Sequence, residues 1–128
     1  MMNINVINEC TELSFEGNIK FPDVIKQLAA NKVERYLVDL VGKQKLNYGA
    51  DNNVYTESLP LNGQAVSPTF DVAAIKSAIL DSQQNKINYP DFLDRIIASG
   101  CSHYEVFITG RKVIYFGRDG SQHIELFP

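Results

Sequence analysis

The sequence has few of the residues that most often mark a specific chemistry. It contains no tryptophan, two cysteines and two histidines among 128 residues. Cys10 and Cys101 are too few and too far apart in the sequence for a disulfide scaffold or a thiolate zinc site, so we interpret both as small buried apolar residues. No catalytic or cofactor-binding motif is present. We therefore predict no catalytic residue, no metal site and no cofactor.

Clusters of basic residues and long apolar runs are also missing. The net charge is −3, and the lysines and arginines are dispersed along the chain. This argues against nucleic acid and anionic membranes as partners, because both favour clustered cations. The opening residues, MMNINVINEC, have neither the charged and apolar regions of a signal peptide nor the length of a membrane span. We therefore expect a cytoplasmic protein.

The sequence does contain an internal similarity. Residues 1–60 align with residues 69–128 without a gap, and the identical pairs include Ile7/Ile75, Pro22/Pro90, Asp23/Asp91, Tyr36/Tyr104, Gly42/Gly110 and Gly49/Gly117. This predicts a tandem duplication. A single domain is expected over residues 1–128, with a first repeat at 1–60, a connector at 61–69 and a second repeat at 70–128, because a unit of about 60 residues is marginal alone.

Each half predicts two helices followed by three strands. Apolar residues recur at helical spacing, and Pro22 and Pro90 suit the first turn of a second helix. The period then changes to two, which is typical of strands. Gly100 predicts a left-handed helix cap, whereas Lys32 at the matching place predicts an exit that is looser or differently turned. The helices are expected near 3–14 and 71–83 and from Phe21 and Tyr89, and the strands in VERYLVDL, KLNYG, VYTESL, SHYEVFI, VIYFG and HIELF.

These elements predict an α+β fold. Each antiparallel meander has one apolar face that the helices must cover, so the two halves are expected to share one core with pseudo-twofold symmetry. The register of the hairpins depends on loop length. An odd number of loop residues places Leu46 and Tyr48 on the core face with Val38 and Leu40, and we adopt that register here.

Two stretches of the sequence carry a resemblance to a known family. The segments FPDVIKQLAANKVERYLVDL (21–40) and ASGCSHYEVFITGRKVIYFGRDGSQHIELFP (98–128) resemble the YbcV-like family of small enterobacterial and phage-associated proteins. This family is a domain of unknown function that is sometimes labelled phage envelope protein. The resemblance spans nearly the whole chain and supports the expected fold boundaries. It implies no catalytic residues.

The only two histidines suggest a site on the second meander. In the adopted register, five polar residues of the second half share the sheet face opposite the core. Imidazole and carboxylate groups that lie close together can bind a metal ion or transfer protons. Any alternating polar strand gives the same spacing, so a solvated sheet face is the competing interpretation. The candidate binding residues are His103, Glu105, Tyr115, His123 and Glu125.

Apolar residues on the same outward face suggest an interaction surface. Leu37, Phe107, Val113 and Phe127 are expected to point away from the core, and such a group on a bare sheet favours a partner or a second copy. The leading hypothesis is thus a small cytoplasmic, phage-associated binding or interaction module without catalytic activity, with a possible homo-oligomer. The alternative is a metal-dependent or general acid–base enzyme that uses the two histidines with Glu105 and Glu125.

Overall fold

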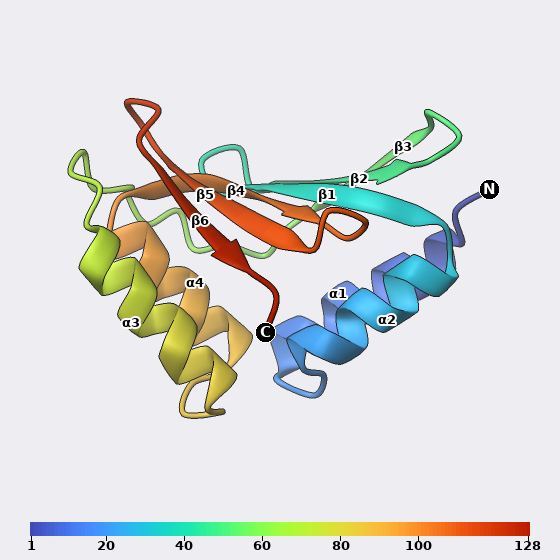
Figure 1. The fold of residues 1–128 in the computed structure, drawn as a ribbon, viewed down its shortest axis with the longest axis horizontal. Helices are drawn as coiled ribbons and strands as arrows, with labels where there is room; N and C mark the ends of the chain where they lie inside the picture. Colours follow the sequence, from blue (N-terminus) through green and yellow to red (C-terminus); the bar gives the residue numbers. More distant parts are fainter.

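The computed structural model describes residues 1–128. It contains four helices and six strands, which confirms the expected α+β class (Figure 1). The helices are α1 (Ile4–Glu16), α2 (Phe21–Ala30), α3 (Val72–Gln83) and α4 (Tyr89–Ala98). The strands are β1 (Val33–Asp39), β2 (Gln44–Gly49), β3 (Val54–Ser58), β4 (Cys101–Phe107), β5 (Lys112–Gly117) and β6 (Gln122–Leu126).

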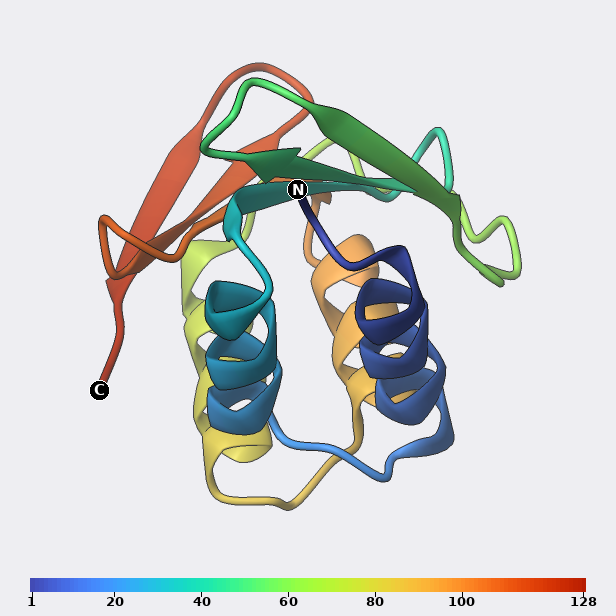
Figure 2. The same ribbon diagram turned by 90° about the vertical axis from the view of Figure 1, so that its right-hand side faces the viewer.

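All six strands form one antiparallel sheet in the order β3-β2-β1-β4-β5-β6. The central pair, β1 and β4, joins the two halves of the chain, and β3 and β6 are the edge strands. All four helices lie against one face of this sheet, which we call the inner face (Figure 2). The opposite face, called the outer face, carries no helix. The helices form two hairpins, α1 with α2 and α3 with α4, which spread apart beneath the sheet (Figure 1).

The helix boundaries follow from local sequence signals. The side chains of Asn3, Asp71 and Asn88 accept hydrogen bonds from backbone N–H groups in the first turns of α1, α3 and α4. This satisfies donors that a helix amino terminus otherwise leaves unpaired. Pro22 and Pro90 lie in the first turns of α2 and α4, as their fixed φ favours.

The exit from α4 needs a glycine. Gly100 has φ +92°, and a Cβ at this position would lie 2.1 Å from the backbone oxygen of Thr69. The connector therefore passes too close for any side chain, and the left-handed cap expected here is confirmed. Lys32, after α2, also adopts a left-handed conformation, with φ 69°. The looser or differently turned exit that we expected at Lys32 is wrong, because the same backbone turn forms without glycine.

The hairpin register differs from the one adopted above. The first loop consists of residues 40–43, an even number, so Val38 pairs with Lys45 and Leu37 pairs with Leu46. The Asp39 carboxylate accepts hydrogen bonds from the N–H groups of Val41 and Gly42, which holds this loop in place. Leu46 and Tyr48 consequently lie on the outer face. Lys45 and Asn47 lie on the inner face, where apolar residues were expected.

Both halves of the chain contribute to one core. A single cluster of 23 buried apolar residues includes Ile7, Leu28 and Val38 from the first half and Ile75, Ile96 and Val106 from the second. This cluster lies between the inner face and the helices. No helix has both the length and the apolar character needed to cross a membrane.

Candidate functional site

A cavity that opens to solvent lies between the helices and the inner face of the sheet. Its volume is about 730 Å³, and residues from all four helices and from strands β1, β2, β4, β5 and β6 line it. Its lining residues come from both helix hairpins, α1–α2 and α3–α4, and from the sheet that the hairpins cover.

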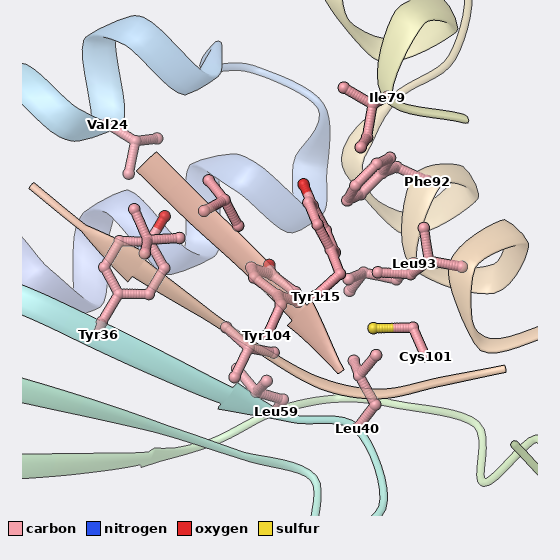
Figure 3. Packing of buried hydrophobic residues seen from close by; sticks show 14 of the residues in the cluster. Val24, Tyr36, Leu40, Leu59, Ile79, Phe92, Leu93, Cys101, Tyr104 and Tyr115 are labelled. Atoms are coloured by element: carbon pink, nitrogen blue, oxygen red, sulfur yellow. The ribbon is translucent and has the colours of Figure 1, made fainter. Parts of the chain in front are cut away.

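Four tyrosines gather on the floor and wall of this cavity. Tyr36 comes from β1, Tyr104 from β4 and Tyr115 from β5, whereas Tyr89 comes from the first turn of α4. The rings of Tyr104 and Tyr115 lie 5.4 Å apart, and the hydroxyl oxygens of Tyr89 and Tyr104 are 2.5 Å apart. Figure 3 shows Tyr104 and Tyr115 side by side, with Phe92 above Tyr115. Four phenol groups thus converge from both layers of the protein.

The tyrosine hydroxyls remain protonated at neutral pH. Burial raises the pKa of Tyr89 to about 12 and raises the pKa values of Tyr36, Tyr104 and Tyr115 above the ordinary value. The neutral phenol is favoured because an ion would lose its hydration inside the protein. These groups can therefore donate and accept hydrogen bonds, but they do not supply a base at neutral pH.

Two of the four hydroxyls have no partner in the protein. Tyr89 and Tyr104 bond to each other, whereas the hydroxyls of Tyr36 and Tyr115 form no hydrogen bond with a protein group. Both residues are only 5% exposed, and both line the cavity. Asn47 Oδ1 is the only side-chain polar atom that is both fully enclosed and unpaired. The hydroxyls of Tyr36 and Tyr115 therefore face the cavity and not the packed core.

Further aromatic rings complete one wall. Phe15 meets Tyr89 edge to face at a centroid distance of 5.2 Å, and Phe92 lies 6.5 Å from Tyr89 and 6.4 Å from Tyr115. Such ring pairs are stabilising beyond the apolar area that they bury. The wall is therefore rigid and apolar, which suits a ligand with an apolar body.

A buried ion pair lies at one end of the cavity. Lys45 Nζ is 3.7 Å from Glu57 Oε1 and 4.5 Å from the centre of the Tyr36 ring. Glu57 Oε1 also accepts hydrogen bonds from Thr11 Oγ1 and Asn47 Nδ2. Burial lowers the pKa of Lys45, and the nearby Glu57 carboxylate opposes this shift. Lysine and carboxylate therefore neutralise each other within the protein.

The ion pair has no equivalent in the second half. Val113 and Tyr115 stand at the places on β5 that Lys45 and Asn47 hold on β2. Sequence reasoning missed Lys45 because the odd-loop register places it in solvent. Its replacement by valine in the otherwise similar second half was the available signal.

The predicted binding residues do not form one cluster. Tyr115 pairs with His123 and Val113 pairs with Glu125, which places His123 and Glu125 on the inner face with Tyr115. His103 and Glu105 alternate along β4 with Tyr104 and Val106. They lie on the outer face, because Tyr104 and Val106 face the core. The expectation of a common face is wrong, and the reason is the even-length hairpin loop.

Each part of the divided set has its own contacts. His123 Nε2 lies 3.1 Å from Glu125 Oε1, and Glu125 lines the cavity. On the outer face, Glu105 Oε2 accepts a hydrogen bond of 2.8 Å from Arg35, and the His103 ring stacks on Phe116. No group of three or more His, Cys, Asp and Glu side chains is placed to hold a metal ion. The four residues on which the enzyme alternative depends therefore do not form one cluster.

The predicted interaction residues also divide. Leu37 and Phe107 lie on the outer face as expected. Val113 is buried in the core, and Phe127 packs edge to face on Phe21 of α2, with ring centroids 5.4 Å apart. For Val113 and Phe127 the expected outward orientation is wrong, again because of the register. Other apolar residues occupy the outer face instead: Leu46, Tyr48, Val54, Ile114, Phe116, Ile124 and Leu126.

Fold and site together define an α+β protein whose antiparallel sheet is covered on one face by two helix hairpins, with a tyrosine-lined cavity between the layers. Residues 14–125 match the family described as "Protein of unknown function (DUF1398)", and the chain belongs to this family. No curated protein matches the sequence significantly. The expectation of a family of unknown function is thereby confirmed.

Proposed function

We propose that the protein is a binding module that holds a small, largely apolar ligand in the central cavity and does not transform it. The cavity carries this proposal: its volume of about 730 Å³ lies within the range of ligand sites in proteins, which is roughly 300–1,000 Å³. Aromatic rings line it, and a few polar groups converge on it, as is usual for such sites.

The titratable groups around the cavity favour binding over catalysis. The tyrosine hydroxyls are neutral at physiological pH for the reason given above. Burial raises the pKa of the Cys101 thiol to about 12, so this cysteine is not a thiolate nucleophile. Lys45 and Glu57 are engaged with each other. Among the buried groups of the lining, those that remain available are the neutral tyrosine hydroxyls, which supports recognition of a ligand.

Binding of N-phenyl-1-naphthylamine tests this function. This uncharged dye fluoresces strongly only in apolar surroundings, and we expect saturable binding with one dye per chain. Val24 and Ser82 line the cavity from α2 and α3, so Val24→Phe and Ser82→Phe should each weaken the affinity at least about tenfold by filling the space. Val41→Phe is the control, because Val41 is 64% exposed on a hairpin loop outside the cavity.

Circular dichroism verifies that each variant is folded before its affinity is compared. The absence of saturable binding to the native protein would refute the proposed function. Equal affinity in both folded cavity variants and in the control would do the same, because the dye would then be binding elsewhere.

A second candidate function is self-association through the outer face. Apolar side chains extend across this face, and Val54, Ile124 and Leu126 are each more than half exposed. Its central charges are paired within the face, since Arg35 bonds to Glu105 and stacks over the Tyr48 ring. A second copy of the same face would therefore meet an apolar surface without a net like charge, and we propose a second copy as the partner.

We also propose that the two halves arose by tandem duplication. Both halves have the element order helix, helix, strand, strand, strand, and the sheet order is symmetric about the β1–β4 pair. Apart from Gly63 in the connector, every residue with positive φ has a positive-φ counterpart at the aligned position of the other half. The pairs are Gly17/Asn85, Lys32/Gly100, Lys43/Arg111 and Asn52/Gly120. This agreement supports equivalent folding of the halves with pseudo-twofold symmetry.

The resemblance to YbcV-like proteins extends the proposal to the setting of the protein. We propose a cytoplasmic role associated with phage or prophage genes. The matched family carries no functional description, so the ligand must be identified from the chemistry of the cavity.

A further inference from the structure

We infer that the cavity selects an uncharged ligand that joins an apolar body to one hydrogen-bonding oxygen or nitrogen, and that the hydroxyl of Tyr36 or of Tyr115 binds this polar group. The inference rests on the proposed binding function and adds the chemical class of the ligand. It follows from two features of the lining, which are the balance of buried charge and the two hydroxyls without partners.

The buried charge of the cavity lining is already matched. Lys45 has Glu57 as its partner, whereas the Glu125 side chain is one third exposed to solvent. The other charged lining residues, Lys20, Lys86 and Asp91, are exposed at the rim. A carboxylate or ammonium group on the ligand would enter a low-dielectric space with no free counter-charge, and its lost hydration would not be compensated. The lining therefore disfavours ions of either sign.

Among the buried residues of the lining, Tyr36 and Tyr115 carry the free hydrogen-bonding capacity. They stand on β1 and β5, on either side of β4, and their hydroxyls face the cavity without a protein partner. Tyr104, on the strand between them, already bonds to Tyr89. A polar group on an apolar ligand can accept from or donate to either of the two free hydroxyls. Because the surroundings are apolar, such a bond discriminates strongly against a ligand that cannot form it.

Matched probes separate charge from hydrogen bonding. Naphthalene, 2-naphthalenemethanol, 2-naphthoate and 2-naphthylmethylammonium share one ring system and differ in the attached group. Each is measured at pH 7 by displacement of N-phenyl-1-naphthylamine from the native protein. We expect 2-naphthalenemethanol to bind about threefold to tenfold more tightly than naphthalene. Both ions should bind more than about tenfold more weakly than 2-naphthalenemethanol.

Tyrosine variants assign the polar contact. In the double variant Tyr36→Phe, Tyr115→Phe, naphthalene and 2-naphthalenemethanol should bind with nearly equal affinity, because the hydroxyls are gone and the rings remain. The single variants show which of the two hydroxyls makes the contact. Tyr48→Phe is the matched control, because Tyr48 lies on the outer face and does not line the cavity. Its preference should equal that of the native protein.

The outcomes are distinct. Tight binding of either ion, or an unchanged preference in the double variant, overturns this inference and leaves the proposed binding function standing. Failure of the dye to bind the native protein overturns the proposed function, and the inference falls with it. The result is the ratio of the affinities of two probes for the same variant. A general loss of affinity in that variant lowers both values and cancels from the ratio.

Discussion

The hydroxyl oxygens of Tyr89 and Tyr104 lie 2.5 Å apart and connect the first turn of α4 to the centre of β4. One of the two donates and the other accepts, so the pair joins the helical layer to the sheet beside the cavity. Phe15 of α1 packs on the same Tyr89 ring. Tyr89 therefore links both helix hairpins to the sheet.

This contact predicts a measurable coupling between the two tyrosines. Tyr89→Phe and Tyr104→Phe each remove one hydroxyl without changing the ring. In a double-mutant cycle measured by urea unfolding, we expect a coupling free energy of about 1 kcal/mol, which is typical of one hydrogen bond between neutral groups. Tyr55 bonds to Asn8 elsewhere, so Tyr55→Phe combined with Tyr89→Phe should be additive. Additivity of the Tyr89 and Tyr104 variants would contradict the prediction.

The Lys45–Glu57 pair predicts a second, larger effect. Lys45→Met leaves the Glu57 carboxylate buried without its cation, and we expect a loss of about 3–5 kcal/mol in the free energy of unfolding. Lys45→Met with Glu57→Gln removes both charges, and a glutamine oxygen can still accept from Asn47. The double variant should therefore be more stable than Lys45→Met alone.

Denaturant unfolding measures these variants, with Lys76→Met as the control for loss of an exposed lysine. If Lys45→Met lowers the free energy of unfolding no more than Lys76→Met does, the ion pair does not stabilise the fold. A double variant less stable than Lys45→Met would show that Glu57 has another essential partner.

Local sequence signals were sufficient for the elements but not for their faces. Asn88 and Pro90 specify the start of α4 through chemistry that operates within one turn, and the predicted start at Tyr89 is confirmed. The face of β2 depends instead on whether the loop after Asp39 has an odd or even number of residues. Both lengths fit the same glycine-containing turn signal. One residue of error reversed the face of every later side chain in the hairpin.

The candidate site was less predictable than the fold for a related reason. Lys45 and Asn47 alternate with Leu46 and Tyr48, so the usual rule places the polar pair in solvent and the apolar pair in the core. The structure reverses this, because Glu57, Thr11 and the Tyr36 ring surround Lys45. Such a partner set comes from three separate elements and cannot be inferred from one strand.

The buried phenols and thiol predict a loss of stability at alkaline pH. Burial raises the folded-state pKa of Tyr89 and of Cys101 to about 12, above the values of 10.0 and 9.0 for the free groups. Their contribution to stability is therefore complete below about pH 9 and decreases as the pH rises towards the folded-state pKa values. We expect the urea midpoint to fall progressively from pH 9 to pH 11.

Tyrosine absorption tests the cause of this loss. In a Tyr48→Phe, Tyr55→Phe background, only the four cavity tyrosines contribute to the absorbance at 295 nm. That absorbance should rise together with the loss of the folded circular dichroism signal. Ionisation near pH 10 in a chain that is still folded would show that these tyrosines are accessible to water.

Two glycines with similar backbone angles separate conformational strain from steric clash. Gly100 and Gly120 have φ +92° and +86°, but a Cβ at Gly100 would meet the Thr69 backbone at 2.1 Å, whereas no atom lies within 4 Å at Gly120. Gly120→Ala should cost about 1–2 kcal/mol through the left-handed conformation alone. Gly100→Ala should lower the free energy of unfolding by clearly more than this. Thermal or urea unfolding of both variants measures the difference. Equal costs would indicate that the connector moves away freely.

The outer face predicts that the protein forms a dimer in solution. Ile124 and Leu126 lie on β6 with 51% and 68% exposure, and they extend the apolar surface to the sheet edge. Sedimentation velocity should detect a dimer at tens of micromolar, and Ile124→Lys with Leu126→Lys should yield a monomer, because two buried ammonium groups would lose their hydration. Leu80→Lys is the control, because Leu80 is 51% exposed on α3, on the helical side of the molecule. A native protein that is monomeric at these concentrations, or a dimer that survives both lysines, would exclude this face as the contact.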